Sequence, residues 1–193
     1  MARIPLQHRK TLFVRAMTAY SKRAYGKVLE PGLAALHNRR VLWTMVRSER
    51  SVARWNTLPA EVASLATMGS AAAIGCSWCM DYGYWEYHAA GVPRELLEAV
   101  PQWRTSDVFD DHQRQVLGYA EAMTATPPEV TDEMVEDLRG WLSDAQLVEL
   151  TALIALENQR SRTNHAFGLT SQGFKEFCEL PPATTSPSAT STA

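Results

Sequence analysis

The sequence predicts an all-α protein, folded as an orthogonal bundle of about seven or eight helices. Apolar residues recur at helical spacing along most of the 193 residues, whereas segments with the alternating pattern of strands are scarce. Proline and glycine separate the periodic segments. Two capping boxes, Asp110-x-x-Gln113 and Ser143-x-x-Gln146, mark helix starts. These observations favour helices throughout the chain.

The expected helices follow one another in a defined order. Glu30-Pro31-Gly32 is expected to break the chain between the first two helices. The segment LVELTALIAL, residues 147–156, is apolar on nearly all sides and should be buried. The expected helices are 9–25, 33–46, one that opens at Pro59, 77–90, 93–99, one that follows Asp110, 132–140 and 143–166.

The chain is expected to divide into a basic N-terminal helical arm (1–32), a helical domain (33–180) and a disordered tail (181–193) rich in Pro, Ser and Thr. Residues 1–54 carry a formal charge of +10, and residues 55–193 carry −12. We interpret this asymmetry as a basic arm that packs on an acidic body, its own or that of a second copy. An arm that binds nucleic acid or a membrane is the alternative.

Composition also bears on location and partners. No apolar run reaches the ~18 residues that a membrane span requires. The N-terminus lacks the apolar stretch and cleavage site of a secretory signal. With only three cysteines, a structural disulfide framework is not expected. We therefore expect a soluble, cytoplasmic homo-oligomer with no nucleic-acid or membrane partner.

The sharpest chemical signal is the segment GCSWCMD, residues 75–81, where Gly75 ends an Ala-rich helix and the next helix begins. Cys76 and Cys79 are three residues apart and so share one helix face. Cys76 sits at the helix start, where free backbone N–H groups and the helix dipole stabilise a thiolate. The second cysteine can then resolve an oxidised intermediate as a disulfide. The pattern predicts a dithiol redox site.

The cysteine pair has three other interpretations. A zinc site needs two further ligands, and the sequence offers only Cys178, acidic residues and scattered histidines, with no second CxxC. The pair could also be inert, buried between helices rich in small residues. A thioredoxin fold would require βαβ strands that this sequence does not show.

Residues 61–91 read EVASLATMGSAAAIGCSWCMDYGYWEYHAAG. The Ala-rich helix, the I-G-C-x-x-C-x-D junction and the A-A-G-V-P helix stop resemble the core of the carboxymuconolactone decarboxylase-like superfamily, on its alkylhydroperoxidase D-like branch. The resemblance covers roughly residues 33–178 and includes LENQRSRTNHA at 156–166. It implies the orthogonal helical bundle of the alkylhydroperoxidase D-like type, a homo-oligomer, and peroxidase chemistry through the CxxC pair. No metal or other cofactor is expected.

The sequence departs from the family pattern at two positions. In the peroxidase branch, a glutamate twelve residues before the first cysteine and a histidine four after the second relay a proton to activate the thiol. These positions are Ser64 and Gly83 here, and neither can transfer the proton in that way. Weak peroxidase turnover is therefore expected. Glu61 and Glu86 each lie one helical turn from a lost position and are candidates to substitute.

We therefore expect a thiol-dependent peroxidase or disulfide oxidoreductase with catalytic residues Cys76, Cys79, Glu61 and Glu86. Its substrate would be a hydroperoxide or a disulfide, and an external thiol reductant would restore the dithiol. The resemblance assigns the attack to Cys79, whereas the position at the helix start favours Cys76, so the order stays open. A carboxymuconolactone decarboxylase-like lyase and a non-enzymatic, oligomeric redox sensor are the alternatives.

Overall fold

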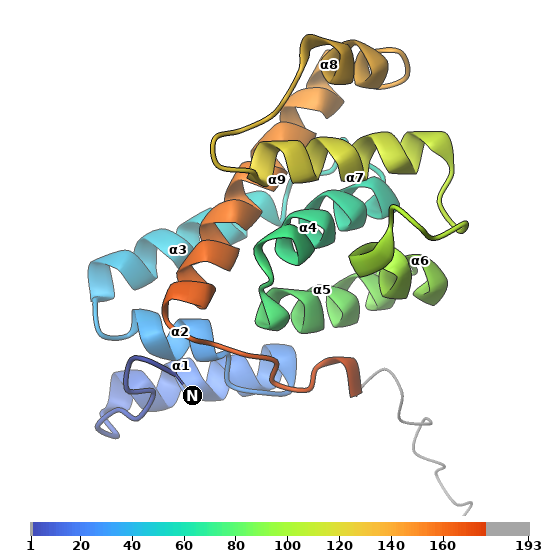
Figure 1. Cartoon of the computed structure of the whole chain (residues 1–193). Helices are drawn as coiled ribbons and strands as arrows, with labels where there is room; N and C mark the ends of the chain where they lie inside the picture. Colours follow the sequence, from blue (N-terminus) through green and yellow to red (C-terminus); the bar gives the residue numbers. More distant parts are fainter. Residues whose placement is uncertain (1, 177–193) are drawn as a thin grey trace, which may run out of the picture.

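The computed structural model describes residues 2–176, and every regular element within that range is a helix (Figure 1). The all-α prediction is therefore confirmed. In chain order the elements are α1 (Leu12–Tyr25), α2 (Glu30–Ala35), α3 (Arg39–Val52), α4 (Ala60–Ile74), α5 (Ser77–Ala89), α6 (Arg94–Ala99), the 3-10 helix η1 (Val100–Gln102), α7 (Asp111–Thr124), α8 (Asp132–Arg139) and α9 (Asp144–Ala166).

Helix α4 lies at the centre of the bundle and packs against α5, α7 and α9 (Figure 1). All eight residues from Ser64 to Ala71 are buried, and most of their side chains are small. Small side chains allow neighbouring helices to approach closely. At Gly69, an added Cβ atom would lie 3.1 Å from Cδ2 of Leu117 on α7. The Ala-rich sequence of α4 therefore reflects helices that pack on several of its sides.

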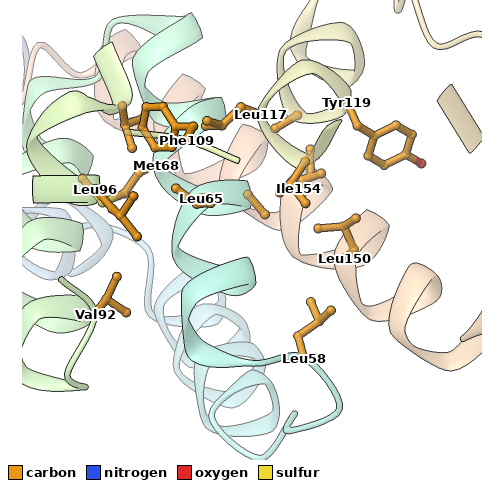
Figure 2. Packing of buried hydrophobic residues seen from close by; sticks show 14 of the residues in the cluster. Leu58, Leu65, Met68, Val92, Leu96, Phe109, Leu117, Tyr119, Leu150 and Ile154 are labelled. Carbon is orange, nitrogen blue, oxygen red and sulfur yellow. The ribbon is translucent and has the colours of Figure 1, made fainter. Parts of the chain in front are cut away.

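An apolar core fills the space between α4 and its neighbours (Figure 2). Leu65 and Met68 of α4, Leu117 of α7 and Ile154 of α9 are each at most 1% exposed. Burying an apolar side chain of this size typically contributes ~1.5–3 kcal/mol relative to leaving it in water. The core therefore holds α9 firmly on α4 and so fixes which face of α9 reaches the start of α5.

Both predicted capping boxes are present. The Asp110 carboxylate accepts the backbone N–H of Gln113 at 2.8 Å, and the Gln113 side chain accepts the N–H of Asp110 at 2.9 Å. Ser143 and Gln146 form the same pair at the start of α9. Each box satisfies two N–H groups that have no partner within their own helix.

The middle of α9 differs from the prediction. Leu150 and Ile154 are fully buried, but Val148 is 68% exposed. The expectation that residues 147–156 are buried on nearly all sides is therefore wrong. The helix packs with one side on α4 and α7, and its other side faces outward.

The predicted helix over 33–46 is also wrong. Helix α2 begins at Glu30 and holds Pro31 in its first turn, where proline is tolerated because its missing N–H would have no intrahelical partner. The chain then turns, and the Asn38 side chain caps α3 by accepting two backbone N–H groups at 3.1 and 3.3 Å. The expected boundary after Gly32 falls inside α2, and the division into arm and domain stays a prediction.

The basic N-terminal segment packs against the last part of the described chain. Arg3 donates to the carbonyl oxygens of His165 and Ala166 at the end of α9, both at 3.0 Å. Lys27 donates to the carbonyl of Gly173 at 2.9 Å. Positive side chains stabilise the exposed carbonyls at a helix C-terminus. These two residues therefore bind backbone oxygens of the body.

Two further expectations concern the rest of the chain. The predicted disordered tail, residues 181–193, lies outside the described residues, as does Cys178. Within residues 2–176, no helix is long and apolar enough to cross a membrane.

Candidate functional site

The CxxC segment forms the turn between α4 and α5. Gly75 ends α4 with φ 77°, a backbone conformation that glycine adopts without strain. Cys76 is the N-cap of α5, as the sequence predicted, and its Sγ accepts the backbone N–H of Cys79 at 3.3 Å. The two cysteines form a disulfide, with their Cα atoms 5.3 Å apart. The turn thus places both sulfurs at the positive end of α5.

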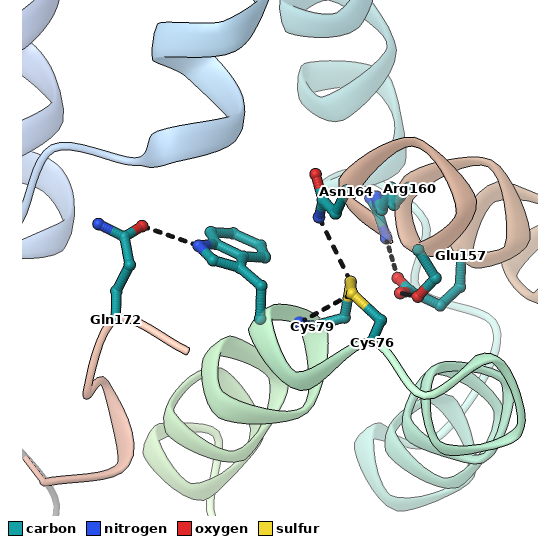
Figure 3. The surroundings of a disulfide bond; sticks show 8 residues. Cys76, Cys79, Glu157, Arg160, Asn164 and Gln172 are labelled. Carbon is teal, nitrogen blue, oxygen red and sulfur yellow. Dashed lines mark hydrogen bonds and ion pairs between the residues drawn. A yellow bond between two sulfur atoms is a disulfide. The ribbon is translucent and has the colours of Figure 1, made fainter. Parts of the chain in front are cut away.

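The second polar contact to the disulfide comes from α9 (Figure 3). The side-chain amide of Asn164 donates to Sγ of Cys79 at 3.4 Å. Cys76 is 2% exposed and Cys79 is 6% exposed, so both sulfurs are shielded from solvent. Each sulfur therefore has one N–H donor, which favours a thiolate in the reduced protein, whereas the burial of both sulfurs opposes it.

A buried polar face of α9 continues from Asn164 toward the N-terminus of that helix. Glu157, Ser161 and Asn164 are spaced by four and three residues, share this face, and are each at most 4% exposed. Ser161 donates to one carboxylate oxygen of Glu157 at 2.6 Å, and Arg160 contacts the other at 3.4 Å. In the view of Figure 3, the Glu157 carboxyl group is drawn on the Cys76 side of the disulfide.

Arg160 joins this face to α3. Its guanidinium forms two hydrogen bonds to the carboxylate of Glu49, one of them at 2.9 Å. A bidentate arginine–carboxylate pair is geometrically specific and strong for its class. Glu49 is therefore the principal partner of Arg160, whereas the contact between Arg160 and Glu157 is longer.

The environment shifts the protonation of several groups in this region. Burial raises the pKa of Glu157 to about 7, although Arg160 and Ser161 oppose the rise. Desolvation also raises the pKa of Glu86, against the effect of Arg160, even though part of the Glu86 side chain remains exposed. Burial and the charge of Glu86 raise the pKa of Tyr87 above its ordinary value. Glu157 is thus a carboxyl group that changes charge near neutral pH.

Segments from both ends of the described chain cover the disulfide. Gln172 accepts a hydrogen bond from the Trp78 indole N–H at 2.7 Å and from the backbone N–H of Glu30 at 3.0 Å. Its amide donates to the carbonyl of Val28 at 3.1 Å. Phe174 is fully buried against Trp78 and the cysteines. We call residues 28–30 and 171–175 the cap, because they shield the disulfide from solvent.

Asp81 ties the cap to α5. Its carboxylate accepts the backbone N–H groups of Gln172, Phe174 and Lys175 at 2.8, 3.0 and 2.8 Å. Burial alone would raise the pKa of Asp81, but these hydrogen bonds, with one from Ser171, lower it below its usual range. The aspartate of the C-x-x-C-x-D junction therefore anchors the cap as a carboxylate.

The two positions that carry the proton relay in the peroxidase branch are inside the α4–α5 packing. Ser64 is fully buried, and its hydroxyl donates to the carbonyl of Glu61 at 2.6 Å. A Cβ atom at Gly83 would lie 3.2 Å from Cγ of Met68. No proton-transferring side chain occupies either position, in agreement with the sequence analysis.

The structure separates the two acidic candidates. Glu61 lies at the start of α4, which is 15 residues long, so ~20 Å of helix separate it from the turn that holds Cys76. Its carboxylate accepts a hydrogen bond from Gln113 of α7 at 2.6 Å. Glu86 lies in the polar region near Arg160 and accepts a hydrogen bond from Tyr82 at 3.3 Å. The geometry therefore favours a structural role for Glu61 and keeps Glu86 near the site.

Residues of other segments also reach the disulfide, and no local sequence pattern predicted them. Glu157 is 81 residues from Cys76 along the sequence, and Asn164 and Gln172 are 85 and 93 residues from Cys79. Packing of the helices and the cap brings these residues together. Glu157 did leave a signal, since it is an acidic residue directly after the apolar residues 152–156 of a helix that was predicted to be buried. Such a carboxylate needs partners and a reason to be inside.

A separate pocket of about 950 Å³ opens between α4, α5, η1 and the C-terminal segment. Met80, Tyr84 and Trp103 line it, but neither cysteine does. Within residues 2–176, no three side chains of His, Cys, Asp or Glu come together as metal ligands would. The cysteines of the described chain are therefore arranged for a disulfide and lack the further ligands of a zinc site.

Comparison with known proteins adds to this geometry. Residues 39–122 match the carboxymuconolactone decarboxylase family. The uncharacterized protein YnjA of Escherichia coli is 37% identical over 106 residues. That match covers 55% of this chain and 57% of YnjA, so it spans little more than half the length of this relative.

Solved structures show the same fold. The alkylhydroperoxidase D core of a peroxidase-related protein from Ralstonia eutropha has a TM-score of 0.79 at 16% identity, over 93% of this chain and 97% of that one. The debrominase Bmp8 has a TM-score of 0.75 at 20% identity, over 90% and 93%. Likeness at this level of identity establishes the fold alone. Residues 39–122 thus resemble the carboxymuconolactone decarboxylase family, and the chain has the helical fold of alkylhydroperoxidase D-like proteins.

Proposed function

We propose that this protein is a thiol-dependent oxidoreductase that reduces hydroperoxides by cycling between a Cys76–Cys79 dithiol and a disulfide. The observation that carries the proposal is the pair itself. The two cysteines are within disulfide distance at the N-terminus of α5, and each sulfur accepts a hydrogen bond from an N–H group. Such donors stabilise a thiolate, which is the form that attacks.

The cycle balances with two electrons from the dithiol. One thiolate attacks the terminal oxygen of R–O–O–H, the O–O bond breaks, and an alcohol and a cysteine sulfenic acid form. The second thiol attacks the sulfenic sulfur, which releases water and forms the disulfide. An external dithiol reductant then restores both thiols and is itself oxidised to a disulfide. A disulfide substrate would enter through the same thiolate attack.

We further propose that Cys76 is the attacking thiol. It is the N-cap of α5, where the positive end of the helix dipole lies and where backbone N–H groups have no partner within the helix. The family resemblance favours Cys79 for this role. Measuring the alkylation rate of each cysteine against pH distinguishes the two, because the attacking thiol should have a pKa below the free value of about 8.5.

Hydroperoxide consumption in the presence of dithiothreitol tests the function. Cys76→Ser and Cys79→Ser should each abolish turnover, whereas Cys178→Ser should retain it and so controls for the loss of a cysteine. Peptide mapping after oxidation should find Cys76 linked to Cys79. Unchanged consumption in either active-site variant would refute the proposal.

The alternatives make different predictions. A lyase that acts in the 950 Å³ pocket would not require the cysteines, since neither lines that pocket. A redox sensor would form the disulfide once but would not turn over. Oxidation of one dithiol per chain without catalytic consumption of hydroperoxide would support the sensor. Lyase activity that survives Cys76→Ser would support the lyase.

The expected homo-oligomer remains a prediction, and we propose exposed apolar residues of α1 and α3 as its contact surface. Leu12 and Tyr20 of α1 are 84% and 53% exposed, and Trp43 of α3 is 43% exposed. Apolar residues exposed together often mark contacts between subunits. Light scattering at low and high salt tests this, and a monomer at every protein concentration would refute it.

A further inference from the structure

We propose that Glu157 of α9 is the group that takes and returns the proton during thiol chemistry at Cys76, in place of the lost relay between α4 and α5. This inference rests on the proposed function and assigns its acid–base step. Three features of the structure carry it: the position of the carboxyl group, its partners, and the absence of a competing group at Ser64 and Gly83.

The position follows from the register of α9. Asn164 contacts Sγ of Cys79, so this face of α9 lies over the disulfide. Glu157 is seven residues earlier, which is about two helical turns, and therefore lies on the same face. Helical side chains lean toward the N-terminus of their helix, so Asn164 extends from its backbone toward Glu157. Figure 3 shows the Glu157 carboxyl group on the Cys76 side of the disulfide.

The partners of Glu157 leave its protonation state adjustable. Ser161 donates to Oε1 at 2.6 Å, and Arg160 reaches Oε2 only at 3.4 Å because its guanidinium is bound to Glu49 of α3. From α5, Glu86 and Tyr87 face the same region and add negative or neutral groups, not positive ones. The carboxyl group is 3% exposed. It is therefore neither fixed as a carboxylate by a full ion pair nor solvated by bulk water.

A group in this state is suited to both halves of the step. The pKa of Glu157, raised by burial to about 7, means that both forms are populated near neutral pH. The carboxylate takes the proton of the Cys76 thiol, directly or through one water. The thiolate then attacks the terminal oxygen of the hydroperoxide, the O–O bond breaks, and the carboxylic acid gives its proton to the departing alkoxide. Glu157 returns to its starting form, the carboxylate, so the charge of the site is the same before and after the step.

Two reactions of the reduced protein separate this role from a structural one. Oxidation by cumene hydroperoxide needs a proton for the leaving alkoxide, whereas alkylation by iodoacetamide releases iodide, which needs none. In a single turnover at pH 7, Glu157→Gln should slow oxidation by ~10²-fold, since acid–base assistance is typically worth 10²–10⁴-fold. Alkylation of Cys76 should change far less. The inflection near pH 7 in the oxidation rate should be lost, and Glu61→Gln, the matched control, should change neither reaction.

Two variants of its neighbours provide an independent test if Glu157→Gln does not fold. Ser161→Ala removes a hydrogen bond to the carboxylate, so the inflection should move to higher pH. Glu49→Gln removes a repelling charge and frees Arg160, so the inflection should move to lower pH. Opposite shifts support the role of Glu157, and an inflection that moves in neither variant overturns it.

The outcomes also distinguish this inference from the proposed function. If Glu157→Gln slows both reactions equally, or neither, the dithiol can still be the active centre but Glu157 is not its proton carrier. If the wild-type dithiol does not react with hydroperoxide at all, the proposed function is refuted, and the proton step falls with it.

Discussion

The cap over the disulfide gives a prediction that does not depend on the substrate. Gln172 holds three partners at once: the Trp78 indole N–H, the backbone N–H of Glu30 and the carbonyl of Val28. Because both sulfurs are almost fully buried, a reductant must wait for this cap to open. Replacing Gln172 with alanine removes all three hydrogen bonds and leaves the cysteines unchanged.

The size of the effect follows from these bonds. An intramolecular hydrogen bond contributes ~0.5–1.5 kcal/mol net of the exchange with water, so the closed cap should lose about 1.5–4.5 kcal/mol. We take the lower part of this range, ~1.5–3 kcal/mol, as the change in the free energy of opening. Each 1.4 kcal/mol is tenfold, so the open population should rise about 10- to 150-fold.

The rate of disulfide reduction by dilute dithiothreitol, followed by mass spectrometry, measures this population. It should rise by the same factor in Gln172→Ala, as long as opening and closing are faster than reduction. Gln115→Ala is the matched control. Gln115 also accepts an indole N–H, that of Trp141 at 2.8 Å, but it lies near α8 and contributes nothing to the cap. If the two variants are reduced at the same rate as wild type, the cap does not limit access and this reasoning is wrong.

Three further predictions follow from the packing around the site. Asp81→Asn should lower the free energy of unfolding by ~1.5–3 kcal/mol at pH 7, the range for hydrogen bonds to a charged group. Hydrogen bonds hold the folded-state pKa of Asp81 below its unfolded value of about 4. This contribution to stability is therefore present above pH ~4 and is lost as the pH falls through the folded-state pKa. The free energies of urea unfolding of variant and wild type should thus converge in acid. Ser64→Glu combined with Gly83→His should destabilise the fold, since it buries a charge and crowds Met68, and circular dichroism should show a lower melting temperature. Glu61→Gln should leave the pH dependence of alkylation unchanged, because the hydrogen bond to α7 is its only assigned role.

Local signals account for most of the fold that the sequence predicted. The capping boxes at Asp110 and Ser143 and the glycine stop at Gly75 act within a few residues of themselves, and the structure has all three. The misplaced start of α2 has a local cause as well. Glu30-Pro31-Gly32 is typical of a break, but proline also fits the first turn of a helix, and sequence alone does not separate the two uses.

The sequence predicted only the part of the site that lies within one short segment of the chain. Cys76 at the N-cap of α5 follows from the spacing and the preceding glycine, and both are visible in the sequence. The donors and carboxyl groups around it come from α9 and the cap, whose approach depends on how the whole core packs. Glu61 was a wrong prediction of the other kind. It lies one helical turn from the family position at Ser64, but that turn leads away from the cysteines.

The packing of α4 on α5 explains why a proton carrier would reach this disulfide from α9. Position 64 is fully enclosed, and position 83 has no room for a side chain beyond glycine without moving Met68. A glutamate and a histidine between these helices would need that space, which here holds apolar core. Helix α9 crosses the same turn from the other side and supplies a carboxyl group with a serine donor and only a loosely held arginine. A chain that fills the space of the relay with apolar packing can therefore keep acid–base chemistry at its dithiol only if another helix brings the carboxyl group, and Glu157 is placed to do so.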